Sequence, residues 1–303
     1  MGRLGVMFRP EWPPEELPRF VREAERDGFA EVWLVEDCFL VGGLTMAATA
    51  LALTRELRVG IGLLPAAMRN PALSAMEIAG LGRLHPGRLA VAFGHGVEPW
   101  MRQIDARPPN RLAALEETVS AVRSLLAGHE LTVSGKHVRL DRVRLAHVPD
   151  PPPAILIGTT GPRALAAAGR SADGFLLAEG SGPEAVRWAR SEAGGAGETV
   201  VYAWLSVDDD RDAAAEALRG QVEAWRKMDL YPRLFELAGV DDVASLDSDR
   251  LRSLAVAGDP DDCVRAVEGL WEAGADSVVV VPRHEDRAEQ MARFVGSVLP
   301  RLG

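Results

Sequence analysis

The sequence contains eight short apolar runs that recur along its whole length. They are rich in Val, Leu and Ile and too short for helices, and they cover residues 4–8, 31–35, 58–64, 89–93, 154–158, 174–178, 200–207 and 277–281. Segments that are apolar at nearly every position are typical of parallel strands buried on both faces. The sequence therefore predicts a parallel sheet built from these runs.

Segments with helical periodicity separate the runs. In residues 111–128 apolar side chains recur at steps of three and four, and Gly128 stands where a C-terminal cap is expected. Similar patterns predict helices over residues 15–27, 260–274 and about 284–299. Repeated strand–helix alternation in a chain of 303 residues predicts one (β/α)₈ TIM barrel domain over residues 1–303, with a doubly wound sheet as the alternative.

Two segments interrupt this alternation. Residues 130–145, after the fourth strand, have the pattern of a hairpin, and about 227–256, after the seventh, have that of an irregular or helical insertion. Neither has enough apolar periodicity for a domain of its own. We therefore treat both as insertions in the barrel.

Charge and cysteine content narrow the class of protein. The 34 Lys and Arg residues against 44 Asp and Glu give a formal net charge of -10, which argues against nucleic acid or an acidic membrane as partner. Cys38 and Cys263 follow no metal-ligand spacing and are too few for a disulfide framework. With no signal peptide or transmembrane pattern, we expect a cytoplasmic small-molecule enzyme without a metal.

In such a barrel the active site lies at the C-terminal ends of the strands, so the residues that follow each run are the candidate site residues. They are polar or glycine-rich: Glu36-Asp37-Cys38, GLLPAAMRNP (62–71), GHG (94–96), GTTGPR (158–163) and AEGSGP (178–183). Polar loops are common, but together these segments predict a ligand site. Glu179 in the last of them is a candidate cofactor contact.

The GTTGPR segment has the features of a phosphate site. Gly158 and Gly161 permit a tight backbone, and Pro162 stands at the first position of a helix whose free N–H groups would face the barrel mouth. Thr159 and Thr160 would add hydroxyl donors. The alternative is an ordinary capped helix start.

Five segments carry a resemblance to a known family: residues 24–37, 58–81, 84–96, 153–175 and 258–282. In their order and spacing the chain resembles the bacterial-luciferase-like family of flavin- and deazaflavin-dependent oxidoreductases, which includes the methylenetetrahydromethanopterin reductases. The resemblance implies a barrel that holds a flavin-like ring across the strand ends. It places the cofactor phosphate on Thr159, Thr160, Gly161 and Pro162.

The resemblance also implies roles for the third and fourth strands. Many deazaflavin-using members support the ring with a bulged non-prolyl cis peptide in the third strand, which by position is Gly62–Leu63 here. In the GHG loop, Gly94 and Gly96 would let the backbone approach the cofactor, and His95 would lie beside the cofactor side chain or phosphate. The alternative for His95 is a loop histidine that caps a backbone carbonyl.

Further along, Trp100 and Met101 would form the wall on the substrate side. The chain also departs from its relatives at two positions. Glu36-Asp37 replaces the Asp-His pair of several deazaflavin-using members, and Val97 replaces the Glu of members that act on sugar phosphates. Sugar-phosphate oxidation is therefore disfavoured.

Glu36 and Asp37 are candidate catalytic residues, together with His95. Neighbouring residues on a strand point to opposite faces, so only one of the pair enters the barrel. If Val32 and Leu34 face inward, Glu36 does too, and burial would raise its pKa enough for proton delivery. An ion pair between Glu36 and Arg69 is an equal alternative. Cys38 is interpreted as a small apolar filler.

These observations predict an oxidoreductase that transfers a hydride between a non-covalently bound deazaflavin, coenzyme F420, and a small organic substrate. The GHG loop and the GLLP bulge favour F420. The alternatives are a monooxygenase that uses reduced FMN from a separate flavin reductase, and a barrel that binds a flavin without turnover. A homodimer is possible because members of the family are commonly dimers.

Overall fold

Parallel strands form a closed barrel in the part of the chain that the computed structural model describes, residues 2–195, 197–227, 232–239 and 246–302. The main sheet has nine strands, and all but β10 make up the barrel wall. In spatial order the wall strands are β1 (Arg3–Phe8), β2 (Glu31–Leu34), β3 (Arg58–Pro65), β4 (Leu89–Gly94), β7 (Ala154–Gly158), β8 (Gly174–Leu177), β9 (Glu198–Val207) and β11 (Ser277–Pro282). Pairing of β11 with β1 closes the ring. The predicted barrel is confirmed, and the doubly wound alternative is wrong.

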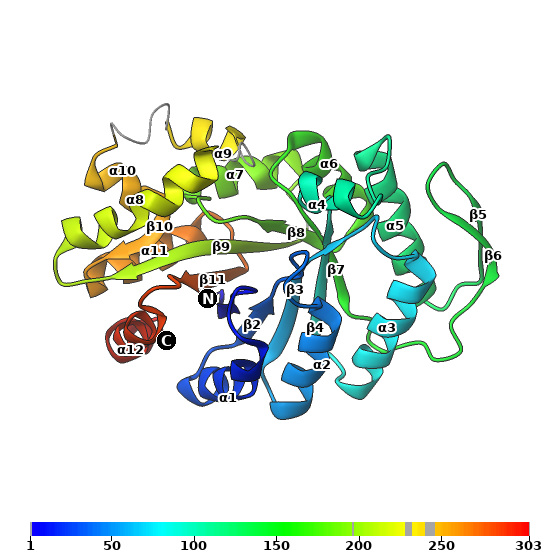
Figure 1. Ribbon diagram of the computed structural model, residues 1–303, viewed down its shortest axis with the longest axis horizontal. Helices are drawn as coiled ribbons and strands as arrows, with labels where there is room; N and C mark the ends of the chain where they lie inside the picture. The colour runs from blue at the N-terminus through cyan, green and yellow to red at the C-terminus, as the bar shows by residue number, and fades with distance from the viewer. Residues whose placement is uncertain (1, 196, 228–231, 240–245, 303) are drawn as a thin grey trace.

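Helices surround this barrel (Figure 1). They are α1 (Leu17–Asp27), α2 (Gly43–Leu53), α3 (Pro71–Leu84), α4 (Glu98–Gln103), α5 (Arg111–Leu126), α6 (Pro162–Ser171), α7 (Pro183–Glu192), α8 (Arg211–Lys227), α9 (Pro232–Leu237), α10 (Ser248–Ser253), α11 (Pro260–Glu272) and α12 (Arg287–Ser297), with short 3₁₀ turns at Pro14–Glu16 and Leu299–Arg301. Gly28 ends α1 with φ of 95°, as its position in the sequence predicts. Within the described residues, no helix has both the length and the apolarity needed to cross a membrane.

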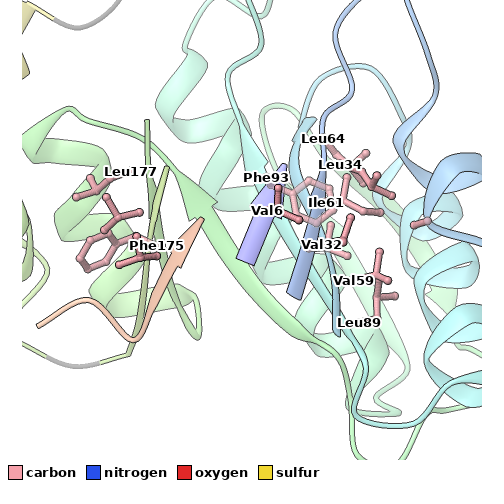
Figure 2. Packing of buried hydrophobic residues seen from close by; sticks show 14 of the residues in the cluster. Val6, Val32, Leu34, Val59, Ile61, Leu64, Leu89, Phe93, Phe175 and Leu177 are labelled. Carbon is pink, nitrogen blue, oxygen red and sulfur yellow. The ribbon is translucent and has the colours of Figure 1, made fainter. Parts of the chain in front are cut away.

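The strands bury two separate layers. Their outer faces pack against the helices through residues such as Val32, Leu34 and Ile61, which lie together in Figure 2. Their inner faces fill the barrel with side chains that include Trp33 and Tyr202. Because both faces are buried, nearly every position of a strand is apolar, which is why the runs are visible in the sequence.

A charged network fills the barrel at the N-terminal ends of its strands. Arg58 Nη1 lies 2.6 Å from Glu31 Oε1, and its Nη2 lies 2.8 Å from Glu198 Oε2. Arg3 contacts both carboxylates, and Ser277 donates to Glu31, whose side chain is fully buried. Burial favours the protonated form of Glu31, but Arg58 and its other partners outweigh that effect and lower its pKa.

The two insertions differ in how well the sequence predicts them. Residues 130–145 form the predicted antiparallel hairpin, β5 (Leu131–Ser134) with β6 (Arg139–Val143), at the edge of the molecule in Figure 1. The segment 227–256 contains α9 and α10, and residues 228–231 and 240–245 lie outside the described part. Its end belongs to β10 (Ala255–Gly258), a strand that the sequence analysis missed, which pairs with the last four residues of β9.

Candidate active site

A cavity of about 750 Å³ opens at the C-terminal ends of the barrel strands. It brings together nearly all the residues proposed from the sequence, from the loops after β2, β3, β4, β7 and β8. The predicted residues that line it are Glu36, Asp37, Gly62, Leu63, His95, Gly96, Trp100, Met101, Gly158, Thr159, Thr160, Gly161, Pro162 and Glu179. Gly94 is the exception, because it packs beneath the cavity lining.

The loop between β7 and α6 presents unpaired backbone donors to the cavity. Gly161 N donates to Thr159 Oγ1 at 3.2 Å, and the Thr160 side chain is only 9% exposed. Within the described residues, the N–H groups of Thr160 and Arg163 have no protein acceptor. A Cβ on Gly161 would meet open space rather than protein, with Thr159 Oγ1 nearest at 3.9 Å. Free donors at a helix N-terminus beside a cavity fit an anionic phosphate.

The third strand is bulged, and Gly62–Leu63 is a cis peptide, as the resemblance predicts. The register with β4 shifts between Gly62 and Leu64, which turns the Leu63 side chain into the barrel. A Cβ on Gly94 would lie 2.3 Å from Leu63 Cδ2, and one on Gly158 would lie 2.7 Å from it. Gly94 therefore makes room for Leu63, which is a different reason from the close approach of cofactor that the sequence suggests.

We expect Gly94→Ala to destabilise the fold by about 1–3 kcal/mol, because its methyl group would overlap Leu63 in a filled interior. The control is Gly80→Ala on α3, where a Cβ meets nothing within 4 Å and helix propensity predicts a gain of about 0.5–1 kcal/mol. Thermal unfolding of both variants measures the difference. Equal melting temperatures would show that Leu63 moves aside without cost.

The GHG loop combines a turn residue with a neutral histidine. Gly96 has φ of 67°, and a Cβ there would lie 3.0 Å from both Met101 Sδ and Pro65 Cβ, so its conformation and its surroundings both favour glycine. Burial lowers the pKa of His95 to about 4, and the nearby Arg111 adds to the effect. At neutral pH His95 is therefore uncharged and faces the cavity as a hydrogen-bonding group.

An inward orientation of Glu36 depended on Val32 and Leu34 facing inward, and that condition is not met, although Glu36 lines the cavity. Val32 and Leu34 belong to the outer layer, and Trp33 and Val35 face inward instead. The Glu36 carboxylate is held by both guanidinium nitrogens of Arg69, with Nη2 to Oε2 at 2.8 Å, and accepts a hydrogen bond from Gly43 N at 2.8 Å. The ion pair that the sequence left as an alternative is thus present.

Asp37 instead carries a carboxyl group suited to proton transfer. Burial raises its pKa to about 6, and the Glu11 carboxylate adds to the shift. Glu179 lies in the same cavity, and burial raises its pKa to about 7; Arg9 opposes this shift, whereas Asp37 and Glu11 add to it. Both carboxyl groups therefore titrate close to neutral pH.

Glu179→Gln is expected to stabilise the protein at pH 8 but not at pH 4. When the pKa of a carboxyl group rises from 4.5 to about 7 on folding, the protein becomes less stable as the pH rises through that window. The reason is that the unfolded state releases the proton at a lower pH than the folded state does. A gain of about 1 kcal/mol or more corresponds to roughly 2–4 °C in Tm. Melting curves at both pH values measure it, and a gain that does not grow with pH would contradict the assignment.

Several cavity residues were not proposed from the sequence: Arg9, Glu11, Arg111, Tyr202, Trp225 and Arg233. Arg9 and Glu11 follow the first strand directly, so the rule applied to the other strand ends would have found them. Tyr202 lies inside a strand, and it can be identified as a cavity residue only if one knows which alternate residues of β9 face the barrel interior. Among the described residues, no cluster of His, Cys, Asp or Glu is arranged to hold a metal ion.

A barrel with a cavity at its strand ends and free backbone donors at a helix N-terminus beside it is an architecture suited to a cofactor-dependent enzyme. The chain matches the luciferase-like monooxygenase family over residues 2–277, and it belongs to that family. It is therefore an oxidoreductase of the luciferase-like type, whose members use flavins or deazaflavins.

Two curated relatives align over nearly the whole chain. The 5,10-methylenetetrahydromethanopterin reductase of Archaeoglobus fulgidus is 27% identical over 334 residues, covering 99% of each chain. The F420-dependent glucose-6-phosphate dehydrogenase of Nakamurella multipartita is 27% identical over 330 residues, covering 96% of this chain and 94% of the relative.

Solved structures show the same fold. The coenzyme F420 dependent tetrahydromethanopterin reductase from Methanopyrus kandleri superposes with a TM-score of 0.85 at 21% identity, covering 100% of this chain and 99% of that one. The oxygenating constituent of 3,6-diketocamphane monooxygenase from Pseudomonas putida, in complex with FMN, gives 0.76 at 17% identity, with the same coverage. Structures of F420 and FMN enzymes therefore share this architecture.

Proposed function

We propose that the protein transfers a hydride between coenzyme F420 and a small organic substrate. The observation that carries this proposal is the joining of two features in one cavity, the phosphate loop after β7 and the inward-turned Leu63 of the β3 bulge. The first can hold a phosphate and the second offers an apolar platform to a ring. The names of the curated relatives, which include an F420-dependent dehydrogenase, support a deazaflavin over FMN.

The phosphate and the ring of the cofactor each have a matching group in the cavity. Thr159, Thr160 and the N-terminus of α6 would hold the phosphate, and Leu63 would lie against the ring. When bound, the deazaflavin supplies or accepts the hydride. The chain's own residues orient the two reactants and exclude water from the cavity.

The proton that accompanies hydride transfer is assigned to Asp37. Asp37 and Glu36 both line the cavity, but the Glu36 carboxylate is held by Arg69, and His95 is neutral with a pKa of about 4. Because the pKa of Asp37 is about 6, it can both hold and release a proton near neutral pH. Its position matches the His of several deazaflavin-using relatives.

FMN-dependent oxygenation is the second candidate, because the FMN-bound monooxygenase shares this fold and the phosphate site suits either cofactor. In that case a flavin reductase would be a necessary partner. The test is to mix the protein with reduced F420 or reduced FMN under air and to screen small carbonyl, imine and alkene substrates. Substrate-dependent oxidation of F420 supports the proposal; oxygenated product formed only with FMN would replace it.

We also propose that the protein forms a homodimer through an apolar face on α2 and α3. Leu73, Met76 and Leu84 recur along one side of α3 and are 54%, 55% and 74% exposed, and Phe39 and Leu40 lie exposed just before α2. The α2 segment GLTMAATALAL has no charged residue. The exposed charges on α3, Glu77 and Arg83, are opposite in sign. Because each chain carries a net charge of -10, two copies repel each other least across a face without net charge.

Met76→Lys should convert the dimer to a monomer, because two-fold symmetry places its charge in the interface twice. Ser120→Lys on the exposed side of α5 adds the same charge elsewhere and should remain dimeric. Light scattering during size-exclusion chromatography gives the mass of each. A monomeric wild-type protein, or a dimeric Met76→Lys variant, would refute this interface.

A further inference from the structure

A hydrogen bond crosses the inside of the barrel below the cavity. Tyr202 Oη on β9 donates to the carbonyl oxygen of Gly62 on β3 at 3.1 Å. In the closed order β3, β2, β1, β11, β9, these two strands lie on opposite sides of the barrel. Tyr202 is 4% exposed and lines the cavity. Its phenol therefore connects one wall of the barrel with the opposite wall.

The neighbours of Tyr202 leave its phenol little freedom. The Trp33 ring packs edge-on against it, with centroids 5.8 Å apart and planes at 76°. A Cβ on Gly62 would lie 2.1 Å from Tyr202 Oη and 2.9 Å from Leu176 Cδ2. Only a residue without a side chain at position 62 lets the hydroxyl reach the carbonyl oxygen.

The carbonyl that Tyr202 holds belongs to the peptide that carries Leu63. Leu63 lies where the register between β3 and β4 shifts, so no residue of β4 is paired with it. Its side chain instead extends over Gly94 and Gly158, both of which lack the Cβ that would collide with it. The hydrogen bond from Tyr202 is thus a direct constraint on how the Leu63 peptide is oriented.

We propose that Tyr202 is a positioning residue that sets the orientation of Leu63 and, through Leu63, the position of the cofactor ring. This inference rests on the proposed function, since it assigns Leu63 to the face of the ring. Tyr202 acts through the bulge and exchanges no proton or electron with the substrate. It is therefore distinct from Asp37, to which proton transfer is assigned.

The test is Tyr202→Phe, which removes the hydroxyl and keeps the ring that packs on Trp33. We expect the Kd for F420 to rise about tenfold, and the absorption band and midpoint potential of the bound cofactor to move toward those of the free cofactor. Thr54→Val is the matched control. It removes a buried hydroxyl outside the cavity that donates to Ala50 O at 2.8 Å and accepts from Arg88 Nη2 at 2.6 Å, so it should lower Tm without changing the bound spectrum.

The possible results distinguish a failure of the positioning role of Tyr202 from a failure of the proposed function. If Tyr202→Phe lowers Tm like Thr54→Val but keeps the wild-type Kd, spectrum and potential, Tyr202 is only structural and the inference fails. If the wild-type protein binds no F420, the proposed function fails and the inference fails with it. Binding by the wild type with a weakened, spectrally altered complex in Tyr202→Phe supports both.

Discussion

Thr160→Glu is expected to weaken F420 binding about a hundredfold, equivalent to about 2.8 kcal/mol. Thr160 lies in the cavity at the start of α6, where the backbone donors face the proposed phosphate position. A carboxylate there would occupy the donors and repel the phosphate in a site with limited access to water. Fluorescence titration of the purified variant with F420 measures the loss.

Thr160→Gln is the matched control, because it has nearly the size of Glu without the charge. If phosphate binding is electrostatic, Gln should cost much less affinity than Glu, and the difference should shrink as salt is added. Equal losses for the two variants would mean that bulk alone blocks the cavity. Wild-type affinity in Thr160→Glu would remove the phosphate from this loop altogether.

Arg58→Met is expected to destabilise the protein by about 3 kcal/mol or more, without changing the cavity. It removes the cation that lies between Glu31 and Glu198, and Glu31 is fully buried. Arg3 remains in contact with both carboxylates but is itself 41% exposed. The expected fall in Tm is roughly 6 °C or more.

The pH dependence of that loss follows from the pKa of Glu31, which is lowered in the folded protein. A lowered carboxyl pKa contributes stability that is present above the unfolded value of 4.5 and is lost as the pH falls below it. The difference in unfolding free energy between wild type and Arg58→Met should therefore become smaller as the pH falls.

The control is Arg26→Met, which breaks an exposed ion pair with Asp27 and should change the unfolding free energy by less than about 1 kcal/mol. Similar losses in the two variants would contradict the account of the network.

The barrel was predictable because its strands are buried on both faces. Runs such as 89–93 and 278–281 are apolar at every position, and each falls within the bounds of β4 or β11. β10 (Ala255–Gly258) was missed although β2 and β8, which are equally short, were predicted. Its sequence AVAG contains only one residue, Val256, that favours a strand, so composition rather than length set the limit of prediction.

The meeting of these residues in one cavity was also predictable, because residues that follow barrel strands lie at the same end of the barrel. The direction of individual side chains was not. Which of Glu36 and Asp37 faces the site stayed open, because it depended on whether Val32 or Trp33 faces inward, and a strand that is apolar on both faces does not show which of its residues face inward. Gly94 was assigned to cofactor approach because the side chain that occupies its space, Leu63 on the adjacent strand, is turned toward it only by the β3 bulge.

The central claim is that the cavity holds a deazaflavin, and parallel titration of the purified protein with F420 and FMN tests it most directly. Both cofactors offer a ring and a phosphate, so the experiment compares them in the same site under the same salt. We predict saturable F420 binding with a Kd at least about tenfold lower than that for FMN. Tighter binding of FMN, or no binding of F420, would contradict the assignment.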